Sequence, residues 1–420
     1  MDKFIVEKSK LSGTVRISGS KNAALPIMAA TLLTDNKCVV KNVPCLRDIT
    51  TMIKILEVLG KKISFKDNIL VVESKKPRKH VAPYRLVKTM RASFCCLGPL
   101  LAKVKKAKVA LPGGCVIGPR PVNLHIKGLA SLGADISIKK GYCQAEVKKL
   151  KGNHIYLGGP FGSSVLATAN VMMAAVLAQG DTFIEHAACE PEINALGQFL
   201  EKMGAEIQGY GTPLIKIKGK KRLEGCEFEV IPDRIEAGTF VAAAMAASSK
   251  ITIEGADPSH LTSVFEASRK MGTKITVSSK SRQIEIKPPK KLKAVNITTL
   301  PYPGFPTDLQ AQFMACLAKA NGISLINEKI YPDRFMHVAE LNRMGALIQK
   351  TGPYAIIEGR NKLQGAQTQA SDLRASAALV VAGLAAEGSS KISRIYHIDR
   401  GYENIEDKLQ KLGANIKRIK

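Results

Sequence analysis

The feature that most constrains the fold is an internal repeat that runs along the whole chain. A segment with helical apolar periodicity ends in glycine and is followed by a short β-type run, and this pattern occurs six times. A glycine just past a helix end can adopt the left-handed conformation that stops the helix. Each copy therefore predicts an outer helix followed by a strand. The glycines are Gly60, Gly133, Gly204, Gly272, Gly345 and Gly413, with spacings of 73, 71, 68, 73 and 68.

A second series of six segments precedes the first and is rich in Ala, Leu and Met on nearly all faces. Apolar residues all around a helix indicate that the helix is buried. We expect these helices at 22–33, 91–103, 164–178, 235–248, 307–320 and 372–386. Short strands follow them, for example at 37–43, 107–111, 181–185 and 250–254.

The two series together predict an α/β protein made of six βαβαββ-type units of about 70 residues, with helices enclosed by sheet. No G-x-G-x-x-G or Walker motif opens any of the helices, which excludes the dinucleotide-binding and P-loop readings.

Composition narrows the classes of function. The net charge of +28 permits nucleic-acid binding, but the lysines are dispersed and the chain has no Trp, so we expect no nucleic-acid partner. A positive field also attracts small anionic substrates. No apolar run reaches the roughly 18 residues that span a bilayer, and the first residues do not resemble a secretory signal, so we expect a cytoplasmic protein. The nine cysteines form no C-x-x-C pair, and we expect neither a disulfide framework nor a metal site.

The starts of the buried helices are unexpectedly polar. Ser, Thr, Asp and Asn at such positions are common N-caps, and capping is an even alternative to ligand binding for each of them. A cation there opposes the helix dipole, so Lys21, Arg91 and Arg234 favour an anion-binding role. The polar starts are Lys21 with Asn22, Arg91, Ser163 with Ser164, Arg234 with Glu236, Thr307 with Asp308, and Asp372 with Arg374.

Three loops add further candidates. Cys115 lies in a glycine-rich loop near Arg120, where a thiol can have a lowered pKa and transfer a proton or attack as a nucleophile. The alternative is a structural cysteine. We expect seven of the other eight cysteines in helices or strands. Arg334 and Arg400 follow later strands, and cationic loops from distant repeats predict one highly anionic ligand.

Several motifs resemble those of the UDP-N-acetylglucosamine enolpyruvyl transferases, and the match runs over essentially the whole chain. They are Ser18-Gly-Ser-Lys21-Asn22-Ala-Ala-Leu-Pro26, Met90-Arg91-Ala92-Ser93, the Leu111 to His125 loop, Pro232-Asp-Arg-Ile-Glu-Ala-Gly-Thr239, Pro303-Gly-Phe-Pro-Thr-Asp308-Leu-Gln-Ala-Gln312, Arg334-Phe-Met-His-Val338, Asp372-Leu-Arg374 and His397-Ile-Asp-Arg400-Gly-Tyr-Glu403.

The resemblance implies a two-domain inside-out α/β barrel, with three repeats in each domain. It places one domain at 21–229 and the other at 1–20 plus 230–420. It also implies a transfer of the enolpyruvyl group of phosphoenolpyruvate to the 3-hydroxyl of UDP-N-acetylglucosamine, with release of phosphate. In that family this is the first committed step of peptidoglycan synthesis, and no metal or organic cofactor takes part.

The resemblance also implies roles for individual residues. Cys115 would be the general acid and the target of fosfomycin, and Asp308 would accept the proton of the sugar hydroxyl. Catalysis would also involve Lys21 and Arg400. The expected contacts to phosphoenolpyruvate are Lys21, Asn22, Cys115, Arg120, Arg334 and Arg400. The expected contacts to the UDP-sugar are Asn22, Arg91, Arg120, Pro121, Val122, Asn123, Leu124, Ser163, Ser164, Val165, Asp308, Ile330 and Asp372.

This chain departs from the family pattern at three positions: Asn123 stands where Asp is usual, Leu166 replaces a glycine, and Ala169 replaces a glutamate. These departures bear on the nucleotide-sugar more than on the type of reaction. Three alternatives therefore remain: the shikimate-pathway enolpyruvyl transferase, a carboxyvinyltransferase for another nucleotide, and a basic RNA- or protein-binding relative without turnover.

Overall fold

Six four-stranded sheets form the framework of the protein. The computed structural model describes residues 2–74, 79–112, 122–278, 283–360 and 362–420, and all six sheets lie within them. In every sheet an edge strand runs parallel to its neighbour. Two antiparallel strands then complete the sheet. The predicted six-fold repeat of an α/β unit is confirmed.

The contacts along the chain divide it into two compact units. One contains the described residues of 1–18 and 232–420, and the other contains the described residues between Gly19 and Ile231. Each unit has its own hydrophobic core, with Phe199 deep in the core of the 19–231 unit and Phe313 deep in the other.

Three sheets belong to the 19–231 unit. The first is completed by a strand from the far end of the unit, because β14 pairs in parallel with β3. In strand order the sheets are β14 (Glu227–Glu229), β3 (Cys38–Lys41), β5 (Ile69–Ser74) and β4 (Lys61–Lys66); β6 (Val81–Ala82), β7 (Lys106–Ala110), β9 (Tyr142–Glu146) and β8 (Asp135–Lys139); and β10 (His154–Tyr156), β11 (Asp181–Glu185), β13 (Leu214–Lys218) and β12 (Glu206–Gln208).

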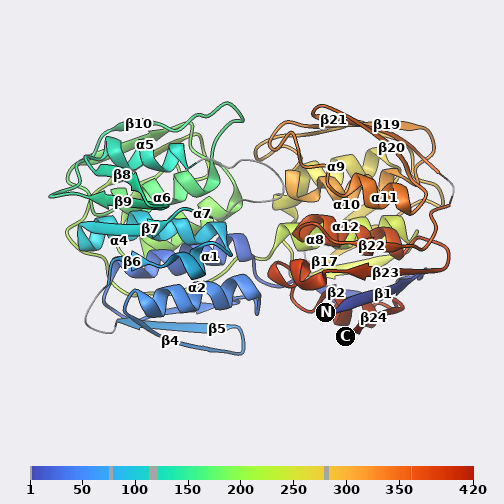
Figure 1. The fold of residues 1–420 in the computed structure, drawn as a ribbon, viewed down its shortest axis with the longest axis horizontal. Coiled ribbons are helices and arrows are strands. Elements are labelled where there is room, and N and C mark those ends of the chain that lie inside the picture. The colour runs from blue at the N-terminus through green and yellow to red at the C-terminus, as the bar shows by residue number, and fades with distance from the viewer. Residues whose placement is uncertain (1, 75–78, 113–121, 279–282, 361) are drawn as a thin grey trace. The chain divides into compact units, whose positions relative to one another are not determined.

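The other unit takes two strands from the N-terminus of the chain. In Figure 1 the dark blue β1 lies beside the red β23 and β24, with which it pairs. The three sheets are β2 (Thr14–Arg16), β15 (Ile251–Glu254), β17 (Gln283–Lys287) and β16 (Lys274–Ser278); β18 (Ile297–Thr299), β19 (Ile323–Glu328), β21 (Tyr354–Glu358) and β20 (Leu347–Thr351); and β22 (Gln367–Gln369), β23 (Ser389–Ser393), β1 (Lys3–Glu7) and β24 (Ile416–Ile419).

The buried helices are those of the second predicted series. They are α1 (Lys21–Ala30), α4 (Leu97–Val104), α6 (Val165–Ala175), α8 (Arg234–Ala246), α10 (Gln310–Leu317) and α12 (Leu373–Gly383). Two expected helical ranges begin instead as 3-10 turns, η2 (Arg91–Cys96) and η4 (Thr307–Leu309). Glycine lets these helices approach closely: a Cβ on Gly98 of α4 would lie 2.2 Å from the carbonyl oxygen of Asn170 on α6.

The outer helices end where the repeat predicts. All six repeat glycines have positive φ, between 85° and 98°, so each helix terminates in the left-handed conformation. The outer helices are α2 (Arg47–Val58), α5 (Asn123–Ser131), α7 (Pro191–Lys202), α9 (Thr262–Lys270), α11 (Val338–Arg343) and α13 (Ile405–Lys411). Among the described residues, no helix has both the length and the apolar character needed to cross a membrane.

Candidate active site

Four of the buried helices are capped by a polar side chain. Ser164 accepts a hydrogen bond from the backbone N–H of Ala167 at the start of α6. The Asp372 carboxylate accepts the N–H groups of Arg374 and Ala375, at 2.8 and 3.1 Å. Capping therefore accounts for at least part of what these two side chains do. Ser20 and Asp233 cap α1 and α8 in the same way.

Lys21 is the first residue of α1 and is buried. A buried lysine normally has a partner of opposite charge. Its Nζ lies 3.1 Å from Oδ2 of Asp48, a buried residue in the first turn of α2. The ion pair fixes the ammonium against the positive end of the α1 dipole. Asn22, next in the helix, is half-buried. Lys21 is among the site residues predicted from the sequence, whereas its partner Asp48 is not.

Asp308 is the centre of a cluster of buried charges in the other unit. Its Oδ1 accepts a hydrogen bond from Nη1 of Arg334 at 2.7 Å, and its Oδ2 accepts one from Nη2 of Arg374 at 3.0 Å. The arginine side chains are 6% and 2% exposed, whereas that of Asp308 is 27% exposed. The carboxylate is thus the part of the cluster that a ligand can reach.

Asp308 is not a helix cap. It lies inside η4, and no side chain forms a capping hydrogen bond at the start of either η4 or α10. Burial raises the pKa of Asp308, but the charges and hydrogen bonds of Arg374 and Arg334 outweigh burial and hold the pKa well below its ordinary value. The carboxylate is therefore ionised at neutral pH and available as a hydrogen-bond acceptor.

The loop that carries Ile330 and Arg334 is anchored by a buried carboxylate, Glu328. Oε1 of Glu328 accepts the backbone N–H groups of Ile330 and Tyr331, both at 2.9 Å, and Oε2 accepts the hydroxyl of Thr307 at 3.0 Å. The Thr307 hydroxyl in turn accepts a hydrogen bond from Nη1 of Arg334 at 3.0 Å. Glu328 therefore holds the loop against the turn that contains Asp308.

A buried polar layer lies behind Arg374. The guanidinium carbon of Arg374 lies 5.2 Å from the centre of the Tyr402 ring. The Tyr402 hydroxyl lies 2.8 Å from that of Thr239, and Nε2 of Gln312 donates to both. The same Gln312 nitrogen donates to the carbonyl oxygen of Asp308 at 3.0 Å. The layer fixes both ends of the Arg374–Asp308 pair.

Arg400 ends a 3-10 turn, η5 (Ile395–Arg400), and is half-buried. The preceding residue, Asp399, pairs with Arg418 at 2.6 Å, which anchors the turn to β24. The next residue, Gly401, packs against Leu373 so closely that a Cβ would lie 2.6 Å from Cδ2. The turn therefore places Arg400 near the start of α12.

Two groups of residues expected to contact the nucleotide-sugar lie at helix starts of the 19–231 unit. Asn123 is the first residue of α5 and is exposed, and Val122 and Leu124 on either side are half-buried. Ser163 and Val165 flank the cap of α6 and are half-buried. Three expected site residues, Cys115, Arg120 and Pro121, lie outside the described residues.

A buried histidine connects this region to Arg91, the first residue of η2. Nδ1 of His125 lies 3.0 Å from Nδ2 of Asn170, so the neutral ring accepts a hydrogen bond from the amide. Burial, with a smaller contribution from Arg91, lowers the pKa of His125 to about 3. The ring is thus uncharged in the folded protein, and it packs edge-on against the ring of Phe94 in η2, with 5.1 Å between the ring centres.

The expectation about cysteines needs correction. The expectation places seven of the eight cysteines other than Cys115 in helices or strands. In the structure, which describes all eight, three lie outside helices and strands, namely Cys45, Cys189 and Cys226. A loop position therefore does not by itself distinguish Cys115. The described residues contain no group of three or more His, Cys, Asp or Glu side chains that could hold a metal ion.

Comparison with known proteins identifies the family. The chain is 51% identical over 420 residues to the UDP-N-acetylglucosamine 1-carboxyvinyltransferase of Methylacidiphilum infernorum, which covers 100% of this chain and 99% of that protein. It is 50% identical to the enzyme of the same name from Desulfosudis oleivorans, with 100% of both chains covered. The chain belongs to the UDP-N-acetylglucosamine 1-carboxyvinyltransferase family. The resemblance inferred from the motifs is confirmed.

Broader comparisons agree on the fold. The family model of EPSP synthase (3-phosphoshikimate 1-carboxyvinyltransferase) matches residues 5–409. The enolpyruvyl transferase NikO from Streptomyces tendae has a TM-score of 0.89 at 22% identity and covers 99% of this chain and 98% of its own. EPSP synthase from Acinetobacter baumannii has a TM-score of 0.77 at 18% identity, with 100% of both chains covered. The fold is therefore that of the enolpyruvyl transferases, as predicted.

Proposed function

We propose that the protein transfers the enolpyruvyl group of phosphoenolpyruvate to the 3-hydroxyl of UDP-N-acetylglucosamine and releases phosphate, as the first committed step of peptidoglycan synthesis. The observation that carries this proposal is the identity of about half of all residues, over the full length, with enzymes of that name. The arginine-held carboxylate of Asp308 supports it, because it supplies an ionised acceptor for a hydroxyl proton.

The proposed reaction is an addition followed by an elimination. The sugar 3-oxygen forms a bond to the central carbon of phosphoenolpyruvate while Cys115 gives a proton to the methylene carbon, and Asp308 takes the hydroxyl proton. In the elimination the methyl group returns a proton to the Cys115 thiolate, the C–O bond to phosphate breaks, and the double bond re-forms. Cations fixed before the reaction stabilise the charge that develops. Lys21, Arg120, Arg334 and Arg400 would supply that charge.

The remaining assignments complete the proposal. Asn22 would contact both substrates, and Arg91, Arg120 to Leu124, Ser163 to Val165, Ile330 and Asp372 would hold the nucleotide-sugar. We further propose that 21–229 and 1–20 plus 230–420 are the two domains, and that the protein acts in the cytoplasm without a metal, an organic cofactor or a nucleic-acid partner.

The direct test measures phosphate release from phosphoenolpyruvate with a panel of acceptors. We expect turnover with UDP-N-acetylglucosamine and none with shikimate 3-phosphate. Preference for another nucleotide-sugar would replace the proposed substrate, and RNA binding without turnover, falling steeply with salt, would replace the proposed activity.

The role of Cys115 has its own test. Cys115→Ala should lose most turnover, and Cys115→Asp should retain it while losing fosfomycin labelling, because a carboxyl group can also donate a proton. Cys45→Ala is the matched control, since Cys45 is exposed and outside the proposed machinery. An adduct mapped to a cysteine other than Cys115 would contradict the assignment.

A further inference from the structure

Two cysteines lie next to each other on neighbouring strands of the first sheet. Cys38 is the first residue of β3, and Cys226 directly precedes β14. The N–H of Val39 donates to the carbonyl oxygen of Cys226 at 2.9 Å, and the parallel register pairs Val39 with Glu227. Cys38 and Cys226 each precede this pair by one residue, and they therefore lie opposite each other. Paired residues on adjacent strands lie within the Cα separation of about 4.4–6.8 Å that a disulfide requires.

The two backbones are also in close contact at this point. A Cβ on Gly225 would lie 2.0 Å from the carbonyl oxygen of Lys37, so the residues that precede the two cysteines are in direct backbone contact. Side chains at paired positions of parallel strands point to the same face of the sheet. The two thiols therefore lie on the same face, where the Cys38 sulfur lies 4.0 Å from the carbonyl oxygen of Asn36.

The surroundings of the pair favour a thiolate. Interaction with the neighbouring Cys226 thiol outweighs burial and, with Lys61, lowers the pKa of Cys38 to about 7. Interaction with Cys38, together with burial, outweighs Lys202 and raises the pKa of Cys226. The thiolate of the pair is therefore on Cys38. By contrast, burial raises the pKa of Cys143 to about 11. The other buried cysteines with resolved shifts are likewise held as thiols.

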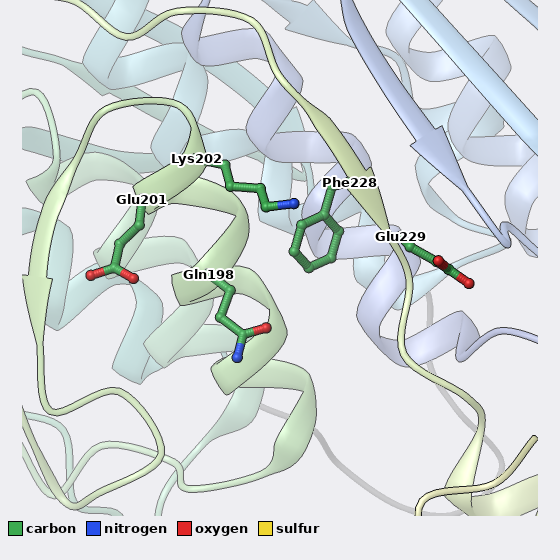
Figure 2. Close-up of a pocket in the computed structure, with 5 residues that line it drawn as sticks. All are labelled: Gln198, Glu201, Lys202, Phe228 and Glu229. Carbon is green, nitrogen blue, oxygen red and sulfur yellow. The ribbon is translucent and has the colours of Figure 1, made fainter. Parts of the chain in front are cut away.

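One thiol of the pair is within reach of a small reagent. Cys38 is fully buried, but Cys226 is half-buried. A hollow of about 570 Å³ is lined by residues of α7 and of β14, the strand that follows Cys226: Gln198, Glu201, Lys202, Phe228 and Glu229. Figure 2 shows the Lys202 ammonium directed toward the Phe228 ring, whose centre is 5.5 Å away. Phe228 lies two residues after Cys226 and so on the same face of the strand. The Cys226 sulfur lies 3.9 Å from the carbonyl oxygen of Phe199, next to Gln198.

We propose that Cys38 and Cys226 are a modification site, which forms a reversible disulfide by exchange with a low-molecular-weight disulfide such as glutathione disulfide. The accessible Cys226 thiol passes its proton to the Cys38 thiolate as its sulfur attacks one sulfur of the reagent, which forms a mixed disulfide and releases one thiolate. The Cys38 sulfur then attacks the Cys226 sulfur, which forms the internal bond and releases the second thiolate. The two protein thiols lose two electrons and two protons. The reagent disulfide takes up both the electrons and the protons and becomes two molecules of free thiol.

The test uses the full-length reduced protein in glutathione buffers of increasing oxidised fraction, followed by acid quenching and peptide mapping. We expect a peptide that links Cys38 to Cys226. We also expect the melting temperature to rise by at least about 5 °C, because a cross-link between residues far apart in sequence restricts the unfolded chain strongly. The proposal would be overturned if the folded protein formed no such link, or formed it only in denaturant.

Variants separate the two steps of the exchange. Cys38→Ala should trap glutathione on Cys226, because no second thiol can release it. Cys226→Ala should leave Cys38 without glutathione, since Cys38 is buried, and this variant keeps the test decisive if Cys38→Ala does not fold. Cys143→Ala, which alters a buried cysteine of the neighbouring sheet, should form the link as the parent protein does. Glutathione found on Cys38 in the Cys226→Ala variant would contradict the proposed order.

Discussion

Replacing Asp308 by Asn should destabilise its unit strongly, because the substitution removes the only carboxylate that pairs with Arg334 and Arg374 within 4 Å among the described residues. Asn keeps the size of the side chain and one acceptor oxygen, so the loss is one of charge. Removing one partner of a buried ion pair costs about 3–5 kcal/mol. For a unit of about 200 residues, about 2–4 °C per kcal/mol gives a fall in melting temperature of about 6–20 °C.

The pH dependence of this effect has a definite sign. The pKa of Asp308 is lower in the folded than in the unfolded protein, so the folded state binds the proton more weakly. The stability that the carboxylate contributes is present above the unfolded pKa of about 3.9 and is lost as the pH falls through the folded value. The difference between the parent protein and the Asp308→Asn variant should therefore be full at pH 7 and shrink in strong acid.

Far-ultraviolet circular dichroism measures the melting, since the chain has no Trp to report by fluorescence. Asp333→Asn is the matched control, because Asp333 is exposed. Its carboxylate lies 3.8 Å from the ammonium of Lys350, and a solvent-exposed ion pair at this distance contributes little to stability. Combining Asp308→Asn with Arg374→Met should cost less than the sum of the single changes, since the two charges interact. If Asp308→Asn melts within about 1 °C of the parent, the buried arginines are compensated in another way and this reasoning is wrong.

Three further predictions concern the 19–231 unit. Asp48→Asn should raise KM for phosphoenolpyruvate more than KM for the UDP-sugar, because the ammonium of Lys21 loses the carboxylate that fixes it; steady-state phosphate release checks this. The pKa of His125 is about 6.5 in the unfolded chain and about 3 in the folded one, so the free energy of unfolding should decline by up to about 5 kcal/mol as the pH falls between these values. Urea midpoints measured across this pH range should vary less for His125→Asn than for the parent protein. Asn123→Asp should lower KM for UDP-N-acetylglucosamine at an unchanged melting temperature, and a poorer KM would favour a different nucleotide.

The repeat could be predicted from sequence because its signal is local. A glycine at each outer helix end reports a backbone conformation that other residues adopt at a cost, and all six glycines have it. The edge strands carry no comparable signal. β14 pairs with β3 across nearly the whole length of its unit, and nothing in three residues of alternating burial specifies a partner so far away.

The candidate site shows the same division. Lys21 could be recognised because a positive charge at a helix start is unfavourable and so indicates another role. Asp48 could not, because a negative charge in the first turn of a helix is favourable and common. For Asp308, capping and chemistry were equal alternatives on the sequence. The position of Asp308 inside η4, where it forms no capping hydrogen bond, removes the capping alternative, and Arg334 and Arg374, 26 and 66 residues away, hold its carboxylate instead.

The two arginines also limit what Asp308 can do. By lowering its pKa they keep the carboxylate ionised at every pH near neutrality, which makes it a constant acceptor for a hydroxyl group. The same interactions make it a weak base, because a proton on Asp308 would leave both buried guanidinium groups without their counter-charge. Such a carboxylate can orient a hydroxyl before the reaction but cannot remove its proton in advance. In the proposed reaction, proton transfer to Asp308 therefore accompanies or follows formation of the carbon–oxygen bond, when the attacking oxygen has become acidic.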